Sequence, residues 1–129
     1  MRDTQSNQVA VVVLKGDLDI ASAMEMRQRL QAPLDARETR LVIDLGGVTH
    51  VDSAGLGEVV RALKLARRAG GDVRLCGLRA DVLRIFEVTG LTKAMAVYLS
   101  REEAIASWGN GRDLVNTNHT NPHDLKRAR

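Results

Sequence analysis

Short apolar runs alternate along the chain with stretches in which apolar residues recur every three or four positions. The runs are rich in β-branched residues and predict strands at Val9–Leu14, Leu41–Leu45 and Val73–Cys76, with a last one at Ala94–Tyr98. The stretches between and after them have the period of an α-helix with one buried face. The pattern therefore predicts strands and helices in alternation.

The first helix is expected to begin at Ser22, because Ser22 and Glu25 have the spacing of a capping box. Pro33 and the polar stretch after it are expected to end this helix. Between these signals, apolar residues at helical spacing form one face, namely Ala23, Met26, Leu30 and Leu34. The spacing thus predicts an amphipathic helix.

Two further helices are predicted after the second and third strands. One runs from about Ser53 to Ala69 and ends at Gly70-Gly71, a sequence suited to helix termination. The other runs from about Arg79 to Val88, with Gly90 at its C-terminal cap. Their inward positions are expected to be Leu56, Val59, Val60, Leu63 and Ala66 in the first helix, and Val82, Ile85 and Phe86 in the second.

The end of the chain divides into a short helix and a polar segment. Ser100 and Glu103 have the spacing of a second capping box, which predicts a final helix reaching Trp108. From Gly109 onward the sequence is polar and shows no apolar period, so residues 109–129 are predicted to be a disordered tail. The folded domain is expected to span residues 1–108.

Strands separated by single helices need crossover connections, which place helices against a sheet. We therefore predict one α/β domain, with a mixed, mainly parallel sheet of four or five strands and about four helices packed on it. Loops that bind partners or ligands in such folds lie at the carboxyl ends of strands. Two acidic, glycine-containing loops are expected there, Gly16–Ile20 and Gly46–Asp52.

Charge and composition exclude some functions. The formal net charge is +3, but residues 109–129 hold four basic and two acidic side chains, a net of +2, which leaves +1 for the first 108 residues. Phe, Tyr and Trp occur once each, so stacking on single-stranded nucleic acid is not expected. The nearly neutral charge of the first 108 residues argues against DNA binding. There is no long apolar span and no charged-then-apolar leader, so we expect a cytoplasmic protein that binds no membrane.

The single cysteine, Cys76, ends an apolar run and has no metal-ligand spacing around it. A free cysteine in such a run is most often a buried structural thiol. We therefore expect no internal disulfide, no metal site and no cofactor.

The most informative segment is Asp52–Gly57, with the sequence Asp-Ser-Ala-Gly-Leu-Gly. At the start of a helix, Asp52 or Ser53 would serve as the N-cap, and that role alone would account for both residues. The same position would leave Ser53 exposed, and phosphate there would add about −1.5 to −2 charge beside the N–H groups of a helix N-terminus. Gly55 and Gly57 either leave room for another protein's active site or allow close helix packing.

Several segments together resemble a STAS domain. They are the strand followed by Gly16-Asp17-Leu18-Asp19, the run Leu41–Leu45, the stretch Val48–Gly57 and the segment Glu87-Val88-Thr89-Gly90-Leu91, in that order over about residues 9–108. The Asp-Ser-x-Gly-Leu-Gly loop is the most specific of them. One departure lies within Met1–Gln8, where the usual first strand of the family is short or degenerate.

The resemblance implies an anti-sigma-factor antagonist, which is not itself an enzyme. In this family an anti-sigma factor that is an ATP-dependent serine kinase phosphorylates the loop serine. The unphosphorylated antagonist binds that kinase and frees a sigma factor, and a metal-dependent serine phosphatase resets it. Ser53 matches the phosphorylated serine, and a monomer is expected when the protein is free. The partner-binding residues implied by the match are Asp19, on the neighbouring loop, and Asp52, Ala54, Gly55, Leu56 and Gly57.

Other functions fit the residues less well. A serine hydrolase needs Gly-x-Ser-x-Gly and a histidine base, but residue 51 is Val51, and His50 is too close to Ser53 in sequence. A phosphoaspartate receiver would use Asp44, which lies within a strand run rather than in a loop. Within the family, one alternative function stays open. The chain could be a STAS subunit of a transporter, or a stress-signalling scaffold, that is never phosphorylated.

Overall fold

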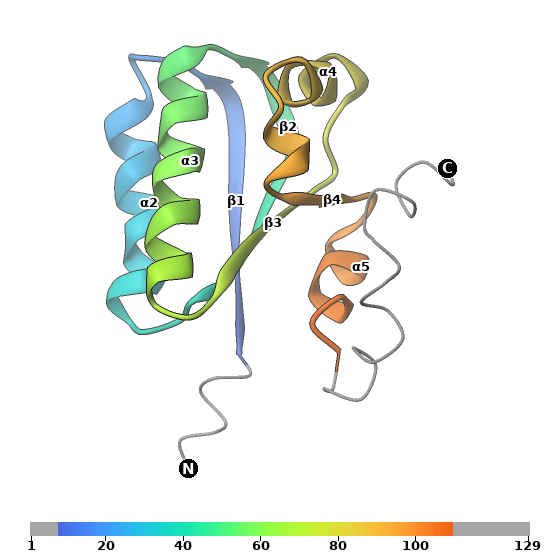
Figure 1. The fold of residues 1–129 in the computed structure, drawn as a ribbon. Helices are drawn as coiled ribbons and strands as arrows, with labels where there is room; N and C mark the ends of the chain where they lie inside the picture. Colours follow the sequence, from blue (N-terminus) through green and yellow to red (C-terminus); the bar gives the residue numbers. More distant parts are fainter. Residues whose placement is uncertain (1–7, 110–129) are drawn as a thin grey trace.

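The computed structural model describes residues 8–109 of the 129-residue chain. The strand expected within Met1–Gln8 and the tail expected over residues 109–129 fall, apart from Gln8 and Gly109, outside this part. The described residues form a sheet flanked by helices (Figure 1). In chain order the elements are β1 (Val9–Leu18), α2 (Ala23–Asp35), β2 (Arg40–Val51), α3 (Ser53–Arg68), β3 (Asp72–Cys76), α4 (Ala80–Val88), the 3-10 turn η1 (Leu91–Lys93), β4 (Ala96–Tyr98) and α5 (Arg101–Ala106).

All four described strands run parallel, in the order β1-β2-β3-β4. Each strand is joined to the next by a crossover that contains a helix, as parallel pairing requires. β1 pairs with β2 from Val9 opposite Arg40 to Leu18 opposite Val51. The predicted α/β fold, with a mainly parallel sheet and four helices, is confirmed, and every pairing in this part of the chain is parallel.

The sheet buries side chains on both faces, because successive residues of a strand point to opposite sides. In β2, Leu41 and Ile43 face the larger core with α2, α3 and α4, whereas Val42 faces the other side. On that side Ala104 of α5 and Trp108 complete a smaller cluster. The helices therefore form unequal layers, with α2, α3 and α4 on one face and α5 on the other.

Arg74 of β3 holds the C-terminal end of α5 against the smaller cluster. Its guanidinium carbon lies 3.8 Å from the centroid of the Trp108 ring, a cation–π contact. Its Nη1 also donates a hydrogen bond to Ser107 Oγ at 2.6 Å. Cys76 is buried in the same cluster, which confirms the predicted structural thiol.

Both segments expected as loops, Gly16–Ile20 and Gly46–Asp52, are mostly strand. β1 continues to Leu18 and β2 continues to Val51. The register between the two strands shifts twice, and such bulges accommodate glycine and polar residues without ending a strand. The loop prediction is wrong for most of both segments, because the buried side chains of Leu18 and Val51 keep the strands paired beyond the glycines.

The first helix lies where the sequence predicts it, but the interactions at its two ends differ from the prediction. α2 starts one residue after Ser22, but the Ser22 side chain caps no N–H of the helix, so the capping box with Glu25 does not form. At the other end, α2 passes through Pro33 and reaches Asp35. Pro33 is buried, and its packing keeps the last turn helical although its ring nitrogen donates no hydrogen bond.

α3 and α4 lie where the sequence predicts them. Gly90 follows α4 in the left-handed conformation, with φ of 82°, as its predicted position at the helix end requires. Of the predicted inward positions of α3, Val59, Leu63 and Ala66 are buried, whereas Leu56 and Val60 are half-buried. The buried face is rotated and also includes Gly55, Glu58 and Ala62.

The second capping box, at α5, is half formed. Ser100 Oγ accepts the backbone N–H of Glu103 at 3.1 Å, as predicted. The Glu103 carboxylate accepts the N–H of Leu99 at 3.3 Å rather than that of Ser100. The helix ends at Ala106, two residues before Trp108.

Candidate functional site

The carboxyl ends of β1 and β2 meet at one edge of the sheet. Leu18 lies opposite Val51, and the backbone N–H of Asp52 donates to the Leu18 carbonyl oxygen at 3.0 Å. α2 and α3 lie side by side and both begin at this edge (Figure 1). Residues 17–24 and 49–57 therefore form one surface, which we call the carboxyl edge.

Asp52 is the N-cap of α3. Its Oδ1 accepts the backbone N–H groups of Ala54 at 2.9 Å and Gly55 at 3.2 Å. Ser53 is the first residue of the helix and is exposed, and its hydroxyl makes no hydrogen bond within residues 8–109. Of the two residues that could cap the helix, Asp52 does so. The Ser53 hydroxyl is left accessible to a reagent or an enzyme.

The two glycines of the loop have different roles. A Cβ at Gly55 would lie 2.4 Å from the Leu18 carbonyl oxygen and 2.8 Å from the Leu18 Cβ, so Gly55 lets α3 pack closely on the end of β1. A Cβ at Gly57 would meet nothing within 4 Å, and Gly57 is exposed. Close packing therefore accounts for Gly55, whereas Gly57 leaves open space one helical turn from Ser53.

The other two loop residues, Ala54 and Leu56, are both half-buried. Leu56 packs against the larger core, so this contact alone accounts for an apolar side chain at position 56. Ala54 contributes its backbone N–H to the Asp52 cap. Neither residue presents a polar side chain to a partner.

Asp19 belongs to an ordered turn that joins β1 to α2. Its Oδ1 accepts the backbone N–H of Ser22 at 3.1 Å, and Ser22 Oγ accepts the backbone N–H of Asp19 at 3.0 Å. Ser22 Oγ in turn donates to the carbonyl oxygen of Asp17 at 2.8 Å. The structure brings Asp19 to the same edge as Ser53, but the described hydrogen bonds of its carboxylate go to Ser22.

Three features of the carboxyl edge were not predicted from the sequence. Thr49 Oγ1 donates to Asp17 Oδ1 at 3.1 Å and ties the end of β2 to that of β1. Ser22 organises the turn around Asp19 rather than capping α2. Ile20 and Met24 are strongly exposed although they are large and apolar. The only sequence signal for these features is the acidic character of the segment after Lys15.

Asp44, the residue that a phosphoaspartate receiver would use, lies away from this edge on β2. Its Oδ2 accepts Nη2 of Arg101 at 2.8 Å, and its Oδ1 accepts the N–H of Gly46 at 2.9 Å. Partial burial raises the pKa of the Asp44 carboxyl, but the hydrogen bonds from Gly46 and Arg101 outweigh it and hold the pKa below its ordinary value. Asp44 thus braces the sheet against α5.

The remaining candidate chemistry finds no support in the part of the chain that is described. His50 is exposed and makes no hydrogen bond to Ser53 there. Within residues 8–109, no three His, Cys, Asp or Glu side chains are grouped as metal ligands. The helices of the same part are all too short or too polar to cross a membrane.

A family model described as STAS domain matches residues 1–104. The chain therefore belongs to the STAS domain family. It is 31% identical over 104 residues to the anti-sigma-B factor antagonist of Bacillus subtilis (strain 168), a match that covers 80% of this chain and 94% of that protein. The family expected from the Asp-Ser-x-Gly-Leu-Gly loop is thereby confirmed.

Solved structures agree on the fold. An anti-sigma factor antagonist from Mycobacterium paratuberculosis matches with a TM-score of 0.70 and 25% identity, over 77% of this chain and 84% of that one. SpoIIAA in its unphosphorylated form matches with a TM-score of 0.67 and 22% identity, over 78% and 88% of the two chains. SpoIIAA in its phosphorylated form matches with a TM-score of 0.61 and 22% identity, over 78% and 91%.

Proposed function

We propose that this chain is an anti-sigma factor antagonist controlled by phosphorylation of Ser53. In its unphosphorylated form it binds an anti-sigma factor that is also a serine kinase, and a sigma factor is freed. The kinase transfers the γ-phosphoryl group of ATP to the Ser53 hydroxyl, and binding ends. The observation that carries this proposal is the exposed Ser53 hydroxyl, which makes no hydrogen bond among residues 8–109 and stands at a helix start that Asp52 already caps. The 31% identity to a named antagonist supports it.

Phosphate at Ser53 acts on binding more than on the fold. It adds about −1.5 to −2 charge at the positive end of α3, which the helix dipole favours. Asp52 already occupies two N–H groups of the first turn, so the phosphate also lies beside a carboxylate. A partner that buries this edge would then have to desolvate a dianion, which costs several kcal/mol without a cationic partner. The phosphorylated form of SpoIIAA supports the compatibility of this fold with phosphate.

The rest of the cycle follows from the same proposal. A metal-dependent serine phosphatase removes the phosphate and restores binding. The chain itself catalyses nothing, requires no cofactor and acts in the cytoplasm, where its kinase meets the sigma factor. ATP is bound by the kinase and not by this chain.

The test uses the anti-sigma factors of the organism that makes this chain, each purified and supplied with ATP. Wild type, Ser53→Ala and Thr89→Val are compared for phosphate uptake by intact mass and for complex formation by gel filtration. Thr89 is the control because it is an exposed hydroxyl residue at the end of α4, outside the carboxyl edge. Wild type and Thr89→Val should take up one phosphate, and Ser53→Ala should take up none and stay bound.

Three results would contradict parts of this proposal. If Ser53→Ala is still phosphorylated, Ser53 is not the acceptor. If phosphorylated wild type binds the anti-sigma factor as tightly as the unmodified chain does in the presence of the same nucleotide, phosphorylation is not the switch. If no anti-sigma factor modifies the wild type, the non-phosphorylated STAS subunit or scaffold becomes the better description.

A further inference from the structure

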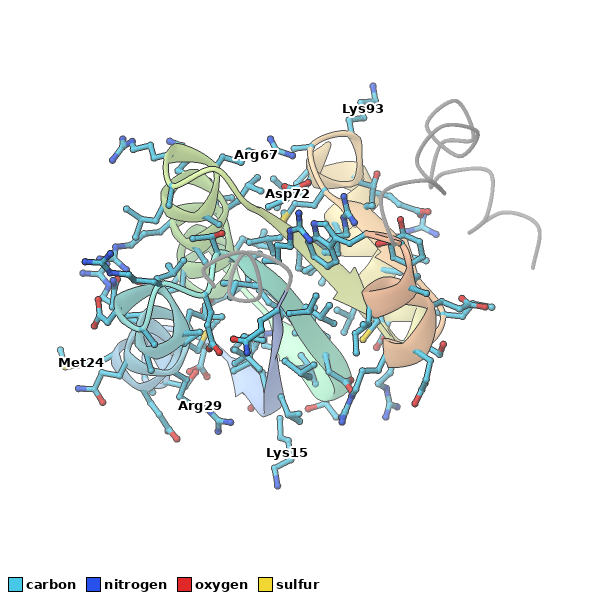
Figure 2. All side chains as sticks on the ribbon, turned by 90° about the horizontal axis from the view of Figure 1, so that it is seen from below. Lys15, Met24, Arg29, Arg67, Asp72 and Lys93 are labelled. Carbon is cyan, nitrogen blue, oxygen red and sulfur yellow. The ribbon has the colours of Figure 1, made fainter. Side chains whose placement is uncertain are left out.

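Two large apolar side chains stand in solvent at the carboxyl edge. The exposed fractions are 80% for Ile20 and 72% for Met24. They are four residues apart, on the turn after β1 and on the first turn of α2. Figure 2 shows the Met24 side chain projecting outward from α2. Side chains of this size usually gain free energy by leaving water, so a pair of them beside a candidate site is typical of a contact surface.

The turn that carries Ile20 is held in place before any partner arrives. Ile20 lies between Asp19 and Ser22, whose backbone and side-chain groups bond to each other at 3.0 and 3.1 Å. A further bond, from Ser22 N–H to the Asp19 carbonyl oxygen, is 3.1 Å long. Since the turn is already ordered, a partner loses little conformational entropy in fixing Ile20.

Carboxylates outnumber basic side chains around this apolar pair. Asp17 and Asp19 precede Ile20, Glu25 follows Met24, and Asp52 lies across the edge beside Ser53. Lys15 and Arg29 line one pocket together with Ser22 and Glu25, whereas the Arg27 guanidinium donates two hydrogen bonds to Glu58 at 3.1 and 2.9 Å. The complementary surface is an apolar recess bordered by basic side chains.

We infer that Ile20 and Met24 form the apolar anchor by which this chain docks on the anti-sigma factor kinase, in a recess of that kinase bordered by Lys or Arg. The inference rests on the proposed function and adds the residues that carry affinity. A few well-packed apolar side chains commonly dominate an interface, while the charged rim sets orientation and association rate. The anchor brings the kinase to the edge, and Ser53 is then the group modified within the contact.

The experiment separates docking from phosphoryl transfer. The probe is the anti-sigma factor that phosphorylates the wild-type chain. Its dissociation constant, and the KM and kcat for phosphorylation, are measured with wild type and an Ile20→Ser/Met24→Ser double variant. Val88→Ser is the matched control, because Val88 is 76% exposed but lies at the end of α4. An Ile20→Leu/Met24→Leu variant tests whether apolar character suffices.

The double serine variant should bind at least about tenfold more weakly and show a raised KM with little change in kcat. The leucine variant and Val88→Ser should resemble wild type, and all variants should melt like it. Unchanged binding of a folded double serine variant, with Ser53 still phosphorylated, overturns the anchor and leaves the proposed function intact. An equal loss with Val88→Ser also overturns it, because the effect is then not local. If the wild type is never phosphorylated, the proposed function fails and the anchor falls with it.

Discussion

The carbonyl oxygen of Leu18 lies so close to the first turn of α3 that residue 55 has no room for a side chain. The separation from a Cβ placed on Gly55 would be 2.4 Å, and the obstacle is backbone rather than a flexible side chain. The same carbonyl accepts the N–H of Asp52 at 3.0 Å, so it cannot move away without breaking that bond. The position of Ser53 therefore depends on a glycine two residues later.

Gly55 and Gly57 form a matched pair for testing this contact. Gly55→Ala should lower the free energy of unfolding, because overpacking costs about 1–3 kcal/mol and the gain in helix propensity is at most about 1 kcal/mol. Gly57→Ala meets open space and should be neutral or stabilising by up to about 1 kcal/mol. Urea unfolding of both variants measures the difference. Equal effects would show that α3 can shift away from β1 freely.

Asp19 can act through its charge or through its turn. We expect Asp19→Ala to impair phosphorylation or kinase docking while the protein stays folded. Asp19→Asn separates the two roles, because the amide oxygen can still accept the Ser22 N–H while the negative charge is lost. If the charge matters, both variants lose kinase affinity; if only the turn matters, Asp19→Asn behaves like wild type. A folded Asp19→Ala protein with unchanged phosphorylation rate and affinity would exclude any role at the site.

The Asp44–Arg101 pair should make stability depend on acid. The pKa of Asp44 is lower in the folded chain than its ordinary value, so protons bind the unfolded chain more readily. The stabilisation by Asp44 is therefore present above the unfolded pKa of about 4 and is lost as the pH falls through the lower folded pKa. Asp44→Asn should be less stable than wild type at neutral pH, and the difference should vanish in acid.

The control for that measurement is Glu38→Gln. The Glu38 side chain makes no hydrogen bond or ion pair among the described residues. Urea unfolding of the three proteins across a pH series gives the comparison. The contrary result is a difference in the free energy of unfolding between wild type and Asp44→Asn that stays constant down to strong acid. That result would mean that the pair stabilises the fold through packing rather than through charge.

Cys76 should be unreactive in the native protein. Burial raises the pKa of its thiol to about 12, with the Asp44 carboxylate adding to the effect. Because the thiolate is the reactive form, almost none is present near neutral pH. A chromogenic thiol reagent should modify Cys76 only in denaturing urea, where one equivalent should react. Rapid modification of the folded chain at neutral pH would contradict the burial of β3 beneath α5.

The order of the elements and the place of Ser53 could be predicted, because both depend on local signals. Apolar periodicity marks α3, and Asp52-Ser53 has the composition of a helix start. These signals lie within one or two turns of the residues they position. The resemblance to the STAS family rests on the same local segments.

The carboxyl end of β1 and the turn after it could not be predicted, because they depend on distant partners. Leu18 stays in the sheet because it pairs with Val51, far along the chain. Ser22 has the spacing of a capping residue, but its hydroxyl bonds to the Asp17 carbonyl once the strand has brought that group near. A sequence pattern cannot show which backbone groups a serine hydroxyl will meet in the folded chain.

The order of the elements along the chain also decides which parts of the sheet are synthesised first. Every residue of the carboxyl edge is made before α3 ends at Arg68, since β1, α2, β2 and the start of α3 supply them all. β4 and α5 are translated later and meet the sheet at its far side. The residues of the carboxyl edge are thus all synthesised while the opposite border of the sheet is still missing, and the border of β2 that β3 later covers is unpaired until then.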